Sequence, residues 1–218
     1  AGVTTIEVTP ASSGNLEVAH SLSAAPEFFF VADDQGYADF SGFPAFHKDL
    51  SSENYLQLDG SDAHSSDSTY FPSGAAHADY IKLGTAFIDE YSNGHNLRIW
   101  AFTGVEGYSK FGKYTGNSSS DGPFVCTGFR PRYLMIKRTT SSDGGWKIMD
   151  TARDPHNVVT KNLYAHQSND EDDLTSHSID LLSNGFKWRT SGNHENANGH
   201  TYIYVAFAES PFKYANAR

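Results

Sequence analysis

Ten histidines raise the question of a metal site in this chain of 218 residues. Zinc sites recur as His-Glu-x-x-His or as paired cysteines, and neither these motifs nor His-x-His occurs here. Most of the histidines stand beside Gly, Asn, Ser or Asp, which are typical of turns. We therefore predict solvated loop histidines, with no metal ligand among them, at His20, His47, His64, His77, His95, His156, His166, His177, His194 and His200.

Two acidic runs carry the oxygen ligands that Ca²⁺ prefers. Asp170-Glu171-Asp172-Asp173 is the denser run, and Asp59-Gly60-Ser61-Asp62 is the weaker one. Neither has the ligand spacing of an EF-hand, so we interpret both as solvated loops. Ca²⁺ binding stays open as the alternative, and the sequence predicts no other cofactor.

Catalytic motifs are missing from the sequence. Gly-x-Ser-x-Gly, Walker and Gly-x-Gly-x-x-Gly patterns do not occur. The single cysteine, Cys126, ends the apolar run Phe124-Val125-Cys126, where we expect a buried, inert thiol. Carboxylate pairs for glycoside hydrolysis have no fixed sequence spacing and stay open. The sequence therefore predicts no catalytic residue and a protein that is not an enzyme.

The three tryptophans are the remaining candidates for ligand contact, because an indole ring can stack on a sugar. Trp100, Trp146 and Trp188 all lie in strand-like runs. Large aromatic side chains in such runs usually pack in a core. We expect core packing at all three, with sugar stacking as the alternative.

Short apolar runs between turn residues would have to position any site, and they predict strands. The hairpin signal Asn184-Gly185 predicts a type I′ turn, and Tyr202–Ala208, apolar on both faces, predicts a central strand. In the second half the predicted strands are 124–127, 133–138, 146–149, 163–165, 179–182, 186–189 and 202–208. This number of strands is typical of an antiparallel sandwich.

The sequence repeats at an offset of 105 residues. The matched segments are 26–31 with 131–136, 80–83 with 185–188, and 93–102 with 198–207. Offsets of 103, between Gly42 and Gly145, and of 107, between Leu56 and Leu163, fall between these anchors. His95 and His200 hold the same place in the two copies, which favours a shared structural role.

The repeat predicts two tandem antiparallel β-sandwich units, jelly-roll-like and related by internal duplication. We place them at residues 1–112 and 113–218, with the glycine-containing stretch 107–117 as a short connector. Superposition of the two units is expected to match Pro26 with Pro131 and Leu83 with Trp188. Residues 1–10 are expected to pair with their own sheet rather than with a neighbouring subunit.

Charge and hydropathy exclude two classes of partner. The net charge of −10 argues against nucleic acid, and no apolar run approaches the ~20 residues of a membrane helix, so no membrane insertion is expected. Residues 1–112 carry a net charge of −11 and residues 113–218 a net charge of +1. No signal peptide is recognised, and Ala1 fits either a processed start or a fragment of a longer protein.

The second half carries a distinctive pattern of segments: Tyr114–Asn117, Asp121–Val125, Thr127–Pro131, Met135–Arg138, Trp146, Leu181–Lys187, Tyr202–Glu209 and Pro211–Arg218. This pattern resembles a domain common in tail-fibre and virion appendage proteins of tailed bacteriophages, especially phages of marine bacteria. The resemblance covers nearly the whole chain, with the first unit as the more divergent copy.

The resemblance implies a structural protein at the virion surface: a tail fibre, spike or head fibre that takes part in host-surface attachment. It implies other virion proteins as partners, a homo-oligomer with a trimer preferred, and a host surface glycan as a further partner. It brings no catalytic or ligand-binding residue. Two alternatives stay open. One is a carbohydrate-binding module of an extracellular or virion-associated protein, and the other is a cellular surface or filament protein.

Overall fold

Aromatic and β-branched residues fill the short apolar runs, and these runs form strands throughout the structure. The computed structural model describes residues 2–10, 14–33, 42–89, 96–142 and 144–210. Within these ranges, helix is confined to the short segments α1 (Ala86–Asp89), α2 (Asn193–Asn196) and a 3-10 turn at Thr175–His177. None of these helices is long or apolar enough to cross a membrane. The prediction of an antiparallel all-β fold is confirmed.

The chain divides into two compact units, one of residues 1–60 and 64–103 and one of residues 61–63 and 104–218. The predicted boundary after residue 112 is wrong, because it falls inside strand β9 (Ser109–Thr115). This strand pairs along its whole length with β17 (Thr201–Ala208) of the second unit. Gly112, which suggested a connector, is needed for packing: a Cβ there would lie 2.6 Å from the hydroxyl oxygen of Tyr204.

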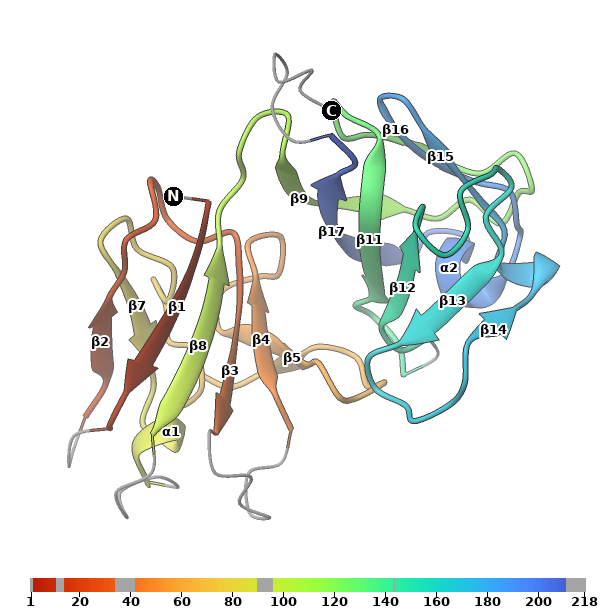
Figure 1. Ribbon diagram of the computed structural model, residues 1–218. Coiled ribbons are helices and arrows are strands. Elements are labelled where there is room, and N and C mark those ends of the chain that lie inside the picture. The colour runs from red at the N-terminus through yellow and green to blue at the C-terminus, as the bar shows by residue number, and fades with distance from the viewer. Residues whose placement is uncertain (1, 11–13, 34–41, 90–95, 143, 211–218) are drawn as a thin grey trace. The chain divides into compact units, whose positions relative to one another are not determined.

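In the first unit, the main sheet has the antiparallel strand order β1-β8-β3-β4-β5-β6. Figure 1 labels the strands of this sheet from β1 to β5. Its strands are β1 (Val3–Val8), β8 (Leu97–Phe102), β3 (Phe28–Asp33), β4 (Pro44–His47), β5 (Asn54–Gln57) and β6 (Ser65–Ser66). A second sheet pairs β2 (Leu16–Ala19) with β7 (Tyr80–Leu83). The N-terminal strand β1 pairs with β8 of its own unit, as predicted.

In the second unit, the main sheet has the antiparallel order β14-β13-β12-β11-β17-β9 (Figure 1). With β9 and β17 it comprises β11 (Pro131–Arg138), β12 (Lys147–Asp150), β13 (Lys161–Tyr164) and β14 (Asp172–Asp173). The smaller sheet has the order β10-β16-β15, from β10 (Phe124–Cys126), β16 (Gly185–Trp188) and β15 (Ile179–Leu182). β17 is the predicted central strand, and its residues Tyr202–Ala206 are all buried.

The two main sheets have the same strand order. Strands β9, β17, β11, β12, β13 and β14 correspond in turn to β1, β8, β3, β4, β5 and β6. The registers agree as well: Phe28 pairs with Phe102, and Tyr133, 105 residues later, pairs with Phe207. Shared topology is what a duplication predicts, and the duplication itself stays a prediction.

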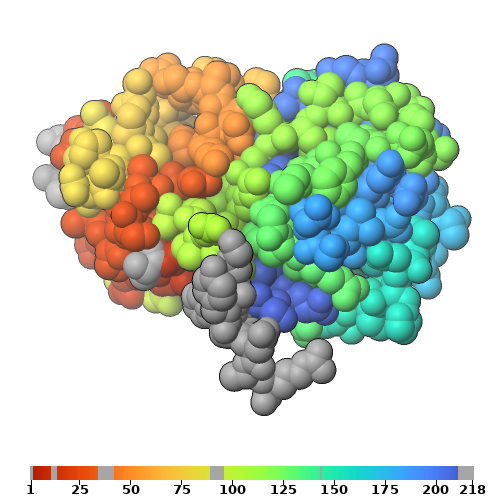
Figure 2. All heavy atoms as spheres, turned by 90° about the horizontal axis from the view of Figure 1, so that it is seen from above, coloured from red at the N-terminus to blue at the C-terminus, as the bar shows by residue number. Residues whose placement is uncertain are grey.

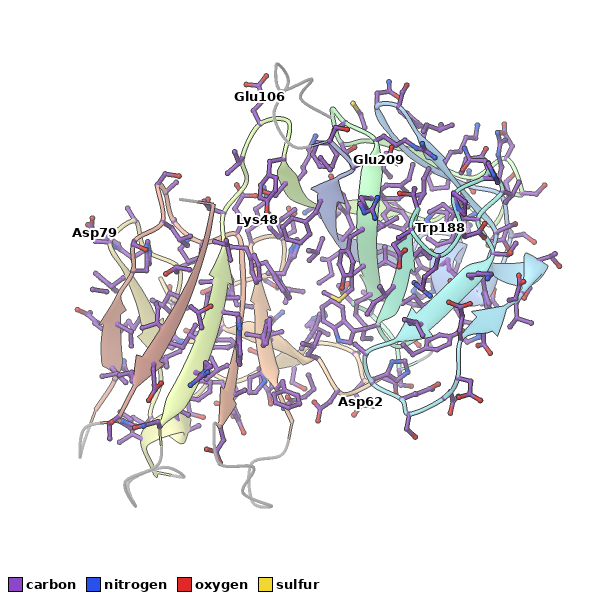
Figure 3. The ribbon with its side chains drawn as sticks, viewed as in Figure 1. Lys48, Asp62, Asp79, Glu106, Trp188 and Glu209 are labelled. Carbon is purple, nitrogen blue, oxygen red and sulfur yellow. The ribbon has the colours of Figure 1, made fainter. Side chains whose placement is uncertain are left out.

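Each unit has its own apolar core. Figure 2 shows the outer surface of the chain, with all heavy atoms drawn as spheres. Phe29 and Val31 of β3 point into the first core. Trp188 lies within the second unit (Figure 3), and both it and Trp146 are 0% exposed, so their predicted core packing is confirmed. Trp100 is half-buried and stacks on Phe30 with ring centroids 5.0 Å apart.

The predicted hairpin joins β15 to β16, but its turn differs from the prediction. Leu182 pairs with Gly185, so Ser183 and Asn184 form the two-residue loop. No positive φ occurs at residues 183–185, which excludes the predicted type I′ turn. Gly185 is required by close packing instead, because a Cβ there would lie 2.1 Å from the carbonyl oxygen of Val125.

Candidate functional site

A polar pocket of about 350 Å³ lies in the second unit. Strands β12, β13 and β14, which are neighbours in the main sheet (Figure 1), supply Lys147, Tyr164 and Asp172 to its wall. Three imidazoles and three small or amide side chains complete the polar lining: His166, His177, His194, Ser61, Ser142 and Gln167. Its volume falls at the lower end of the range for small-molecule sites, ~300–1,000 Å³.

Lys147 is a buried cation in the pocket wall. Side chains alternate along a strand, so Lys147 and Met149 of β12 share the buried face. The Lys147 side chain is 4% exposed, and its ammonium forms an ion pair with the carboxylate of Glu195, which is 0% exposed. Glu195 belongs to α2, so this pair ties the short helix to the main sheet.

His177 completes a group of three interacting side chains with Lys147 and Glu195. Its Nδ1 lies 2.8 Å from the Lys147 ammonium nitrogen and 2.6 Å from Oε1 of Glu195. Burial, followed by the positive charge of Lys147, lowers the pKa of His177 to about 4, so the imidazole is neutral at pH 7. Burial also lowers the pKa of Lys147, to about 7, and the charge of Asp172 opposes that shift.

Tyr164 is held in place from two sides. The Lys147 ammonium lies 5.7 Å from the centre of its ring, and the ring meets His166 edge-on with centroids 5.8 Å apart. Burial raises the pKa of the Tyr164 phenol, and a hydrogen bond with Asp172 raises it further. The phenol is therefore protonated and fixed in position against the pocket.

The imidazole of His166 packs directly over Gly145. A Cβ at position 145 would lie 1.9 Å from the nearest ring atom, so only glycine leaves room for this imidazole. Burial lowers the pKa of His166, while a hydrogen bond with the Trp146 backbone opposes the shift. Nδ1 of His166 is buried and has no hydrogen-bond partner among the described residues.

Lys137 of β11 holds part of the pocket wall in place. Its ammonium is buried and donates hydrogen bonds to the carbonyl oxygens of Ser61 at 2.9 Å, Arg138 at 2.8 Å and Gly144 at 3.3 Å. Burial lowers the pKa of Lys137 to about 8, and the charge of Asp62 opposes the shift. Ser61 and Gly144 both line the pocket, so Lys137 fixes two parts of its rim.

The prediction of solvated loop histidines is wrong for several of the ten. His47 lies on strand β4 and is 0% exposed. His166 and His177 are half-buried in the pocket wall, while His77, His156 and His194 are exposed. The neighbouring turn residues misled the prediction, because a turn can lie over a pocket and bury its imidazole. His95 lies outside the described residues.

His200 interacts with side chains rather than with a turn carbonyl. The imidazole lies 2.9 Å from Nη2 of Arg138 and 2.9 Å from the hydroxyl oxygen of Thr140. It therefore has a structural role in the second unit.

The side chains of the acidic run 170–173 interact with different partners. Glu171 forms ion pairs with Arg153 at 2.8 Å and Lys161 at 3.5 Å, and Asp173 accepts a hydrogen bond from Thr160. Asp172 and Asp173 form strand β14, so the prediction of a loop is wrong for these two residues. Within the described ranges, no group of three or more His, Cys, Asp or Glu side chains could hold a metal ion.

Cys126 is exposed, and the prediction of a buried thiol is wrong. Strand alternation gives the reason: in β10 the middle residue Val125 points inward, so Phe124 and Cys126 on either side point outward.

In the weaker acidic run, Asp59 accepts a hydrogen bond from the backbone N–H of Phe43 at 2.9 Å.

Sequence reasoning did not single out Lys147, Tyr164 or Glu195. The sequence of β12 did contain a signal. Lys147 is two residues before Met149, so both side chains lie on the same face of the strand, and an apolar residue on that face indicates that it is buried. No such signal marked Glu195, because a four-residue helix has too little periodicity to reveal a buried face. The pocket brings these side chains together across separations of up to 48 residues.

Comparison with known proteins gives one family and no function. No curated protein and no solved structure matches the chain. A family model described as "Domain of unknown function (DUF7483)" matches residues 1–211, which include both units. This match covers nearly the whole sequence, and the chain therefore belongs to the DUF7483 family.

Proposed function

We propose that this chain is a non-enzymatic structural protein of a tailed-phage appendage, displayed on the particle surface and involved in attachment to the host. The observation that carries the proposal is the role of the residues that create the resemblance to appendage proteins. Among the described residues of this pattern, several glycines and tryptophans hold the fold together.

Glycines of the shared pattern illustrate this role. A Cβ at Gly116 would lie 2.2 Å from the Ala197 carbonyl oxygen, and one at Gly122 would lie 2.7 Å from the Trp188 carbonyl oxygen. Backbones this close tolerate no side chain, so the pattern encodes a scaffold. The glycines of the pattern therefore support a fold shared with appendage proteins, and the structural role comes from that resemblance.

Internal duplication is part of the proposal. Ala45 pairs with Leu56 in the first unit, and Ile148 pairs with Leu163 in the second. The two pairings are related by the offsets of 103 and 107 residues that the sequence repeat contains. Two units of one topology suit an extended appendage built from tandem modules.

The proposed protein works as a homo-oligomer, with a trimer preferred, in contact with other virion proteins. Closed rotational symmetry is the common solution for homo-oligomers. Light scattering on the purified chain tests the assembly state. A mass of three chains supports a trimer, and a monomer at high concentration contradicts the oligomer.

Purified particles of the phage that encodes the chain test its location. Mass spectrometry of gradient-purified particles is expected to find the chain in a fixed ratio to the capsid protein. Antibodies against it are expected to bind intact particles. Absence from the particles, or detection only after they are opened, contradicts the proposal.

Carbohydrate binding is the second candidate function, and the polar pocket of the second unit favours it. The pocket combines hydrogen-bonding groups with an aromatic ring, as small-molecule sites commonly do. The two candidates are compatible, because an appendage can attach to a host through a glycan.

A further inference from the structure

We propose that the pocket of the second unit is a binding site for a neutral saccharide. This inference rests on the proposed function only for the source of the ligand, a host surface glycan. The site itself is argued from the charges, hydrogen-bonding groups and fixed geometry of its lining.

The two lysine ammonium groups at the pocket already interact with other groups. Acidic side chains lie close to them: Asp172 lines the pocket, Glu195 pairs with Lys147, and the charge of Asp62 acts on Lys137. Lys147 is neutralised by Glu195, and the Lys137 ammonium donates to three backbone carbonyl oxygens. A phosphate or carboxylate ligand needs a cation that is free to meet it. The described lining supplies none, so the pocket favours a ligand without charge.

The lining suits a ligand with many hydroxyl groups. Ser61 and Ser142 offer hydroxyls that donate and accept, Gln167 offers an amide, and Asp172 offers a carboxylate that accepts. The buried Nδ1 of His166 adds a further polar atom that lacks a partner among the described residues. An apolar ligand would leave these groups unpaired, at a cost of about 1–3 kcal/mol for each buried group.

Tyr164 supplies an aromatic surface in a fixed position. The negative face of a phenol ring attracts the weakly positive C–H groups of a pyranose. Asp172, Lys147 and His166 restrain the ring, so little side-chain entropy remains to be lost on binding. The position of the Tyr164 ring is thus fixed before a ligand binds.

In the described part of the first unit, the strand positions that match Lys147 and Tyr164 carry different residues. In matching strand positions, Lys147 pairs with Tyr164 in the second unit, and Pro44 pairs with Gln57 in the first. Neither Pro44 nor Gln57 provides a cation or an aromatic ring. Binding is therefore expected in the second unit alone.

A glycan array tests the inference on the purified full-length chain. The array carries neutral hexose and N-acetylhexosamine oligosaccharides, their sialylated and phosphorylated counterparts, and polysaccharide from the host strain. We expect binding to at least one neutral glycan, and its affinity is then measured by titration calorimetry. Binding to host polysaccharide identifies the source as the host, and binding to defined oligosaccharides alone places the ligand elsewhere.

Two variants place the ligand in the pocket. Ser142→Trp fills the pocket from an exposed position, and Tyr164→Ala removes the aromatic surface. Each is expected to weaken binding by about tenfold or more, the scale of losing one anchor residue. Tyr108→Ala, a half-buried tyrosine outside the pocket, is the control that keeps full binding. Thermal unfolding confirms that each variant is folded.

Three results overturn the inference. They are no glycan binding by the native chain, selective binding of acidic glycans, and neutral glycan binding that Ser142→Trp leaves unchanged. Each is separate from the location test, because the chain can be present on particles without binding sugar. Absence from particles, with sugar binding intact, overturns the appendage role and leaves the pocket assignment standing.

Discussion

Lys147 and Glu195 form an ion pair in which the two side chains are only 4% and 0% exposed. Removing two charges from water costs several kcal/mol per ion, and their attraction compensates only when the geometry is good. The ion pair is therefore expected to add little net stability to the folded state. It does fix α2 against the sheet, and with it the wall of the pocket.

Replacing Glu195 by Gln is expected to destabilise the second unit strongly. The change leaves the Lys147 ammonium buried without its counter-charge, and breaking a buried pair from one side costs about 3–5 kcal/mol. Chemical denaturation at pH 6, monitored by tryptophan fluorescence, measures the loss.

The double variant Lys147→Met with Glu195→Gln is the matched control. It removes both charges, so we expect it to recover most of the stability that Glu195→Gln loses. If the double variant is no more stable than Glu195→Gln alone, the ion pair does not explain the loss.

His177 is expected to make the second unit sensitive to acid. Its folded-state pKa of about 4 lies below the ordinary value of 6.5. Between these two values the unfolded chain binds a proton that the folded chain does not, so stability falls as the pH drops from 6.5 towards 4. Allowing for partial solvent screening, the loss is about 2 kcal/mol.

The pH effect is measured as the free energy of unfolding at pH 4.5 and pH 7. Lys147, Glu195, Asp172 and His194 also face His177, so the native chain is compared with His177→Asn, in which those groups remain. We expect His177→Asn to lose less stability on acidification than the native chain does. His156→Asn, at an exposed histidine, should keep the native pH dependence, and equal slopes in all three chains would refute the assignment.

Gly145→Ala is expected to displace the imidazole of His166. The new methyl group would lie 1.9 Å from the ring, so the ring must move, and overpacking of this kind costs about 1–3 kcal/mol. The Nε2 and Cε1 resonances of His166 in an NMR spectrum report the movement. Unchanged His166 resonances, together with native stability, would show that the ring does not pack on Gly145.

Much of the fold could be predicted from the sequence because alternation and turn residues are local signals. All seven strands expected in the second half were found, with ends that differ by at most two residues. Strands β9 and β14 were missed for different reasons. β9 contains a glycine that packs against Tyr204, and β14 consists of Asp172 and Asp173, which have low strand propensity.

The pocket could not be predicted, because it depends on tertiary contacts between residues that have no characteristic spacing in the sequence. Lys147, His177 and Glu195 come from a strand, a 3-10 turn and a short helix. A lysine in a strand usually lies on the solvent face. Only the packing of the second unit shows that this lysine is buried against a glutamate.

Competition for adsorption tests the proposed attachment role most directly. Host cells are incubated with the purified chain before the phage that encodes it is added, and free phage is counted over time. The account predicts that the native chain slows adsorption and that Ser142→Trp has a much weaker effect, because its pocket is filled. An adsorption rate that the native chain does not change, even at saturating concentration, would contradict the account.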